Sequence, residues 1–296
     1  MTTPTADQWE SPAARLRHAL AARAMVPLDW ALPSRARDAF GIITYHRVAP
    51  LTAGCQPDLN VTPNRFRAQL AGLLKLGYRP WRLADAVQCW RQGTPPPANA
   101  FAVCFDDGYV GVLRHALPVL RELGVPATVF LPTGHLGADT PRPFDLWGAA
   151  HPDASEDLWR VMSVGECEQL ADSGLVDLGS HTHRHEDMRS DPERLAEDMR
   201  ESVTALRDWF GVHSPAFSFP FGMVSPATSD IIRNSGVSCA LTADCQLVRR
   251  DDDPFHWGRF GGEQYDTART LAAKLNGTYS FFQNQWRRLK RLARLG

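Results

Sequence analysis

Two adjacent acids, Asp106 and Asp107, follow the apolar run 101–105 and precede Gly108. Neighbouring residues at the end of a strand point in different directions, so the two carboxylates can take different roles. An Asp-Gly pair after a strand is also ordinary turn chemistry. The pair therefore indicates a catalytic site only if other polar groups join it.

Three of the ten histidines, His181, His183 and His185, fall close together in one short stretch. Two imidazoles and one carboxylate form a three-ligand set that leaves a coordination position for water, as in catalytic metal sites. A second, non-ligating carboxylate can take the proton of that water. The alternative is an exposed His-rich loop. Together the two clusters predict one divalent ion, Zn²⁺ in the first place, with Co²⁺ or Ni²⁺ as alternatives because this ligand set accommodates several ions.

The elements that must position these residues alternate between strands and helices. Strands separated by helices of ordinary length pair in parallel. The fold class is therefore α/β, and about seven strands predict a distorted, seven-stranded (β/α) barrel. Apolar runs bounded by turn residues place the strands at 41–45, 78–81, 101–105, 127–131, 175–179, 216–219 and 237–241.

A parallel barrel brings the carboxyl ends of its strands to one face. His46, the Asp106–Asp107 pair, His181 and Phe221 each follow a predicted strand. We therefore expect these residues on a single rim.

The chain divides into three predicted parts. Residues 1–40 are a lead-in segment, 41–262 form the barrel domain, and 263–296 form a C-terminal basic amphipathic helix. Inside the barrel domain, the turns and aromatic residues of 132–163 are typical of a loop over a site. Basic residues and leucines alternate in 286–295, which predicts a solvated helix packed on the barrel or a peripheral contact with the inner membrane surface.

Composition excludes several classes of protein. The 32 Lys and Arg residues nearly balance the 33 Asp and Glu residues, so no overall field favours nucleic acid. The six cysteines form no Cys-x-x-Cys pair and are predicted to be reduced thiols. Charged residues interrupt every apolar run of signal-peptide or membrane-span length, so we expect a cytoplasmic protein. No oligomeric state is predicted.

Three short motifs follow one another along the chain: Phe105-Asp106-Asp107-Gly108, Ser180-His181-Thr182-His183-Arg184-His185 and Phe217-Ser218-Phe219-Pro220-Phe221-Gly222. They resemble, in order, the first three motifs of the polysaccharide deacetylase family, that is, carbohydrate esterase family 4 with its NodB homology domain. The resemblance covers about residues 40 to 262. An earlier stretch, Tyr45-His46-Arg47-Val48, resembles the N-terminal motif of the branch that includes the biofilm poly-N-acetylglucosamine deacetylases.

The resemblance implies roles for individual residues. Asp107, His181 and His185 match the family's metal ligands, and Asp106 matches its catalytic base. The backbone N–H of Phe221 stands where the family stabilises the tetrahedral oxyanion, a role that needs no particular side chain. His183, between the two ligands, is expected to point away from the metal.

The sequence also departs from the family. Ser218 stands where the family usually has an Arg that orients the base, and Arg259 is a candidate replacement. The family's late Leu-x-His element, which supplies the general acid, is not evident. The branch resemblance makes His46 the candidate acid, and His256 is the alternative.

Aromatic residues near the expected rim are candidates for substrate binding. Sugar rings stack on flat apolar surfaces, so Trp147, Trp257 and Tyr109 are predicted to contact the substrate, together with Arg259. Packing in the core is the alternative for each aromatic residue.

The function that follows is metal-dependent removal of N-acetyl groups from an N-acetylhexosamine-containing saccharide, with a lipid-linked saccharide as one form of the substrate. Two alternatives remain open at this stage. One is an amidase that acts on a small cyclic amide, and the other is a catalytically idle carbohydrate-binding relative.

Overall fold

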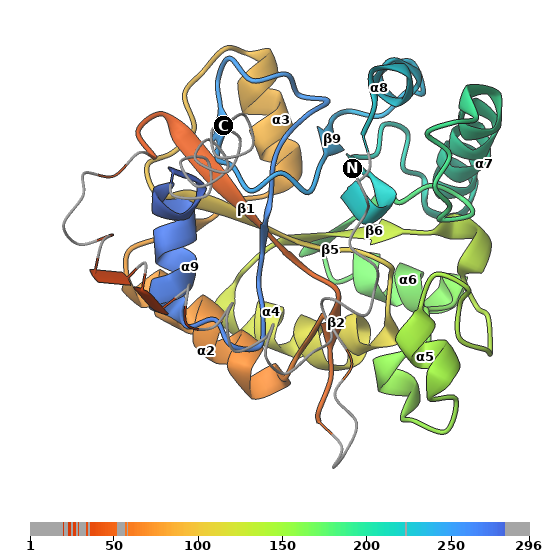
Figure 1. Ribbon diagram of the computed structural model, residues 1–296, viewed down its shortest axis with the longest axis horizontal. Helices are drawn as coiled ribbons and strands as arrows, with labels where there is room; N and C mark the ends of the chain where they lie inside the picture. The colour runs from red at the N-terminus through yellow and green to blue at the C-terminus, as the bar shows by residue number, and fades with distance from the viewer. Residues whose placement is uncertain are drawn as a thin grey trace, which may run out of the picture.

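The computed structural model describes residues 20, 23–24, 26–27, 29, 34, 36–51, 57, 59–222 and 224–281. Its main sheet contains a run of parallel strands in the order β1-β5-β6-β7-β8-β9. In Figure 1 these strands cross the middle of the molecule, with α2 and α4 on one side and α3 on the other. The strands are β1 (Ala39–Tyr45), β5 (Ala100–Phe105), β6 (Ala127–Leu131), β7 (Val176–Ser180), β8 (Phe217–Ser218) and β9 (Ala240–Leu241).

The segment 257–261 joins the two ends of this parallel run. Trp257 forms a parallel bridge with Leu241 of β9. A few residues later, β11 (Phe260–Gly261) pairs in parallel with β1. The parallel sheet with its surrounding helices is consistent with the predicted distorted (β/α) barrel, and 257–261 lies between the last strand and the first.

One predicted strand has a different place. Residues 78–81 contribute only β4 (Arg79–Pro80), which pairs with the start of β5 outside the parallel run. The remaining short strands are β10 (Val248–Arg249), antiparallel to β1, and the separate pair β2 (Arg47–Val48) and β3 (Asn60–Val61).

Helices follow the strands as the sequence pattern predicts. Their ends have local causes: the Thr62 side chain caps the first turn of α2, and Gly211 ends α7 in a left-handed conformation with φ 67°. A π-helical turn, η2 (Val112–Ala116), leads into α4. The helices around the sheet are α2 (Pro63–Lys75), α3 (Leu83–Arg91), α4 (Leu117–Leu123), α6 (Val164–Ala171), α7 (Pro192–Phe210), α8 (Pro226–Arg233) and α9 (Ala268–Leu275).

Alternate residues of β5 face two different cores, because successive side chains of a strand point to opposite faces. Val103 and Phe105 pack outward with Phe66 of α2. Ala102 and Cys104 point inward. Every residue of the strand is buried, which explains its continuous apolar sequence.

The segment 132–163 contains three short helical pieces: η3 (Thr133–His135), α5 (Leu146–Ala150) and η4 (Glu156–Leu158). Beyond the predicted domain boundary at 262, α9 packs Leu271 and Leu275 into the outer core. The basic stretch 286–295 and nearly all of the lead-in segment lie outside the described residues. Among those that are described, no helix combines the length and the apolar character needed to cross a bilayer.

A buried ion pair holds α9 against β11. Lys274 Nζ lies 2.7 Å from Asp266 Oδ2 and donates to the carbonyl of Gly261 at 2.7 Å. Replacing Lys274 with Ala leaves a buried carboxylate without its partner, so we expect the free energy of unfolding to fall by about 3–5 kcal/mol in urea titrations. The control is Lys75→Ala, at the exposed end of α2. A loss in Lys274→Ala no larger than in this control would contradict the assignment.

Candidate active site

Asp107, His181 and His185 form a buried group with the composition of a metal site. One ligand atom from each lies within 4.8 Å of the others. Nε2 of His181 is 3.4 Å from Asp107 Oδ1, and Nε2 of His185 is 3.2 Å from the same oxygen. Two ligands that each stand about 2.0–2.2 Å from a tetrahedral ion are about 3.4 Å apart, so this spacing and donor set fit a divalent metal.

The ring of each histidine is held by its surroundings. His181 donates from Nδ1 to the carbonyl oxygen of Ser218 at 2.7 Å, which turns Nε2 toward Asp107. The ring of His185 lies between two phenylalanines, with centroid distances of 4.0 Å to Phe144 and 4.8 Å to Phe221. Both imidazoles therefore have a fixed direction before any ligand binds.

Asp106 stands beside this group and is held by different partners. Arg259 Nη1 donates to Asp106 Oδ1 at 2.8 Å, and the Ser218 hydroxyl donates to Oδ2 at 3.3 Å. Burial alone raises the pKa of this carboxyl, but the positive charges of Arg259, His181 and His46 outweigh burial and lower its pKa below the usual value. Asp106 is therefore a carboxylate that can accept a proton.

Of the two histidines considered as general acid, His46 lies next to Asp106. Its Nε2 is 3.9 Å from Asp106 Oδ2. Burial lowers the pKa of His46, against the opposing effect of Asp107 and Asp106. His256 instead pairs with Asp244, with 3.0 Å between Nε2 and Oδ2.

Four residues of the site have left-handed backbone conformations, which residues other than glycine rarely adopt. Asp107, Thr182, His185 and Phe221 have φ values of 68°, 65°, 53° and 56°. Each such residue costs about 1–3 kcal/mol and persists only where the surrounding structure holds it. Next to Asp107, Gly108 is also left-handed, and a Cβ there would meet Leu131 Cδ2 at 2.9 Å.

Two of the residues predicted to bind substrate are buried in packing positions. Trp257 is 1% exposed and packs edge-on against Phe40 in the inner core. Tyr109 is equally buried under the guanidinium of Arg47, 4.2 Å from its ring centroid. A ring without an exposed face cannot stack on a sugar, so the predicted contact does not fit either residue.

The other predicted residues are distributed differently. Arg259 is 4% exposed and bonds Asp106, which fits the orienting role and leaves no free surface for substrate. Trp147 is partly exposed and stacks on His151, with 4.5 Å between ring centroids. Phe221 is 52% exposed beside His185. As expected, His183 turns away from the group and its Nδ1 lies 2.9 Å from the Thr133 hydroxyl.

Sequence reasoning missed a buried connection from the strand end to the segment 132–163. Arg47 follows His46, and its Nη2 lies 2.6 Å from Asp145 Oδ1. The same Nη2 donates to the Tyr109 hydroxyl at 2.8 Å. Nε of Arg47 donates to the carbonyl of Leu158 at 2.6 Å. Asp145 also caps α5. The signal in the sequence was a charged residue, Arg47, close to the end of an apolar strand.

The arrangement can perform hydrolysis. It combines three metal ligands, a separate carboxylate kept ionised by an arginine, and a histidine on the same side. A base and an acid beside a metal-ligand group are the parts needed to attack a carbonyl with water.

Comparisons with known proteins agree with this chemistry. Residues 93–240 match the family model described as polysaccharide deacetylase. The chain belongs to the polysaccharide deacetylase family.

Relatives in this family carry more specific names. The chain is 22% identical over 233 residues to a poly-beta-1,6-N-acetyl-D-glucosamine N-deacetylase of Staphylococcus epidermidis, covering 72% of this chain and 75% of that protein. It is 31% identical over 237 residues to the protein of the same name from Escherichia coli K12, covering 71% of this chain. The chain spans about a third, 34%, of the length of that second protein.

Solved structures show the same fold. The structure of IcaB from Ammonifex degensii superposes with a TM-score of 0.65 at 23% identity, covering 80% of this chain and 97% of that one. The α/β fold with its parallel sheet is therefore shared with this protein.

The Arg47–Asp145 pair is expected to hold the segment 132–163 in place. Replacing Arg47 with Ala leaves Asp145 as a buried charge without its partner, so we expect the free energy of unfolding to fall by about 3–5 kcal/mol. Limited proteolysis should also cut the segment sooner. Arg142→Ala, in the same segment but bonded to its neighbour Thr140, is the matched control. Equal cleavage rates in both variants would refute the connection.

Proposed function

We propose that this protein is a metal-dependent hydrolase that removes N-acetyl groups from an N-acetylglucosamine-containing polysaccharide. The observation that carries the proposal is that two adjacent carboxylates have different partners. Asp107 faces His181 and His185, while Asp106 faces Arg259 and His46. Membership of the polysaccharide deacetylase family supports an acetylated sugar as the substrate over a small cyclic amide.

The ligands Asp107, His181 and His185 would hold a divalent ion, which when bound polarises a carbonyl and lowers the pKa of water. We propose Zn²⁺ for this ion, with Co²⁺ and Ni²⁺ as substitutes, because the ligand set contains two imidazoles and one carboxylate.

Asp106 then acts as the general base. It takes one proton from the attacking water, whose oxygen forms the new bond to the acetyl carbon. The backbone N–H of Phe221 donates to the developing oxyanion. His46, on the same side as Asp106, gives a proton to the amine nitrogen as the C–N bond breaks, so that the products are acetate and the free amine.

The polymer itself is proposed from the relatives. The staphylococcal and E. coli proteins are named for poly-beta-1,6-N-acetyl-D-glucosamine. The stretch Tyr45-His46-Arg47-Val48, which places His46 beside Asp106, supports the same class of substrate here. A lipid-linked form of the saccharide and a cytoplasmic location with peripheral membrane contact through 286–295 belong to this proposal. Cell fractionation of the full chain tests the location, and acetate release from a lipid-linked saccharide tests the form of the substrate.

Acetate release tests the activity directly. We expect the protein to release acetate from β-1,6-linked N-acetylglucosamine oligomers, to lose this activity after chelation, and to regain it on addition of Zn²⁺ or Co²⁺. Hydantoin-like cyclic amides are assayed beside the sugars. Undiminished acetate release after complete metal removal would exclude the mechanism, and turnover of the cyclic amides alone would exclude the substrate.

The two carboxylates should respond differently to the same substitution. Asp106→Asn removes the base and keeps the ligands, so we expect kcat to fall by about 10²–10⁴-fold while one metal ion stays bound. Asp107→Asn should lose both metal and activity. Asp139→Asn, at an exposed position of the segment 132–163, is the control. Metal loss in Asp106→Asn equal to that in Asp107→Asn would show that the roles are assigned wrongly.

Arg259 gives an independent test of how the base is oriented. Because its guanidinium is buried and bonds Asp106, Arg259→Ala should lower kcat by about 10²-fold through misplacement of the base, with little change in KM. Arg250→Ala, at an exposed position, should change neither constant. A rise in KM with unchanged kcat in Arg259→Ala would instead indicate direct contact with substrate.

A further inference from the structure

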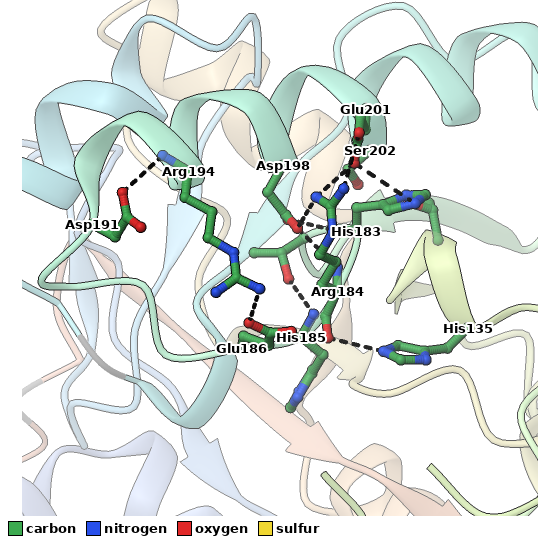
Figure 2. A network of polar contacts seen from close by, with 12 residues as sticks. His135, His183, Arg184, His185, Glu186, Asp191, Arg194, Asp198, Glu201 and Ser202 are labelled. Carbon is green, nitrogen blue, oxygen red and sulfur yellow. Dashed lines mark hydrogen bonds and ion pairs between the residues drawn. The ribbon is translucent and has the colours of Figure 1, made fainter. Parts of the chain in front are cut away.

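Asp198, on helix α7, contacts the turn between the two histidine ligands. Its side chain is fully buried at 0% exposed. Oδ1 accepts from the backbone N–H of His183 at 2.6 Å, and Oδ2 accepts from the backbone N–H of Arg184 at 3.0 Å. Figure 2 shows the carboxylate reaching from the helix to these two residues. We propose that Asp198 is a positioning residue that holds the turn 181–185 in its metal-binding conformation.

The turn needs such support because its own backbone is strained. Thr182 and His185, at φ 65° and 53°, are both left-handed, and a β-branched residue such as threonine rarely adopts that conformation. The hydroxyl of Thr182 accepts from the N–H of His185 at 3.0 Å and closes the turn from inside. The N–H groups of His183 and Arg184 lie on the side of α7, where Asp198 is their acceptor. Without Asp198, these two partly buried N–H groups would lose their hydrogen-bond acceptor.

A carboxylate suits two successive N–H groups better than an amide does. Both of its oxygens accept, and bonds to an ionised acceptor are stronger than bonds between neutral groups. An asparagine at the same place offers one acceptor and one donor, so its NH₂ group would face a backbone N–H. The change Asp198→Asn therefore alters the turn while it keeps the size of the side chain.

The charge of Asp198 is balanced by the turn itself. Arg184 Nη1 lies 3.1 Å from Asp198 Oδ2, and the same guanidinium reaches Glu201 at 2.7 Å. Backbone and side chain of Arg184 thus both bond one buried carboxylate (Figure 2). A buried charge with this many partners is held in a fixed position.

A second link from α7 provides an internal comparison. Arg194 pairs with Glu186, directly after His185, but both side chains are about half exposed, at 48% and 45%. Water screens such a pair, so it contributes little to the position of the turn. Both links are drawn in Figure 2, and only the buried one bonds the backbone between the ligands.

The sequence of α7 shows why Asp198 points inward. Leu195, Met199, Ser202 and Leu206 form the buried face of the helix at intervals of three and four residues. Asp198 lies on this apolar face. A lone carboxylate on a buried helix face must find donors, and the turn 181–185 supplies them.

The inference rests on the proposed function only through the assignment of His181 and His185 as metal ligands. The test uses the full chain and no substrate. Affinity for Co²⁺ and Zn²⁺ is measured by competition with a chromogenic chelator, and the visible spectrum of the Co²⁺ form is recorded. We expect Asp198→Asn to bind metal about 10–100-fold more weakly, as is typical when a group that supports metal ligands is lost, and to show an altered Co²⁺ spectrum.

Two controls separate positioning from general destabilisation. Arg194→Ala removes the exposed link from the same helix. Met199→Ala removes a buried side chain from the same helix face that packs in an apolar cluster. Both should keep wild-type metal affinity and spectrum. A folded Asp198→Asn variant with wild-type affinity and spectrum would overturn the proposal.

A measurement on the wild-type protein does not depend on whether the variant folds. In the metal-free protein, the amides of His183 and Arg184 should exchange with solvent as slowly as those of the neighbouring strand β7, because Asp198 and not the metal holds them. Fast exchange that slows only when metal is added would overturn the proposal. Failure to release acetate from any sugar, with the metal and exchange results as expected, would refute the proposed activity and leave the role of Asp198 intact.

Discussion

The buried ion pair between Arg259 and Asp106 connects the segment between the last and first strands to the proposed active site. Arg259 belongs to the segment 257–261 that links the last parallel strand to the first. Its guanidinium donates to the carbonyl of Thr242 after β9, to the hydroxyl of Thr44 in β1 and to Asp106 after β5. One side chain therefore connects three strands at the face where the site lies. The contact that would orient the proposed base therefore lies in the same segment that links the last parallel strand to the first.

This pair also explains how one site keeps two adjacent carboxylates with different properties. Both acids are buried, and burial raises the pKa of each. Arg259, a permanent cation, is the main group that keeps Asp106 ionised, whereas the nearby side chains of His181 and His185 lower the pKa of Asp107. An arginine stays charged throughout the physiological pH range, so Asp106 remains a carboxylate, as its proposed role as base requires, beside Asp107 as the proposed metal ligand.

Strain in the site is offset by hydrogen bonds from outside it. The left-handed residues Thr182 and His185 lie in a turn that is bonded to the buried carboxylate on α7, and His181 is bonded to the carbonyl of Ser218. The strained geometry thus depends on helix packing and sheet pairing, and the catalytic residues alone do not maintain it. Rigid surroundings of this kind are what a preorganised site requires.

The sequence by itself determined the α/β class, the alternation of strands and helices and the identity of the acids and histidines, because strand and helix periodicity and short motifs are local properties. It also offered Arg259 as a candidate for the missing arginine, from charge and position alone, and in the structure this residue bonds Asp106. It did not reveal that Trp257 and Tyr109 are buried, or that residues 257–261 lie between the last strand and the first.

Tertiary structure decided which distant groups meet. Arg259 and Asp106 are 153 residues apart, and nothing in either local sequence specifies the other. Whether an aromatic residue at a strand end faces solvent or core depends on which segments close over it, and this follows from packing of the whole chain. The candidate catalytic residues can therefore be predicted from the sequence, whereas the residues that hold them in place, such as Arg259 and Asp198, are identified only by the tertiary structure.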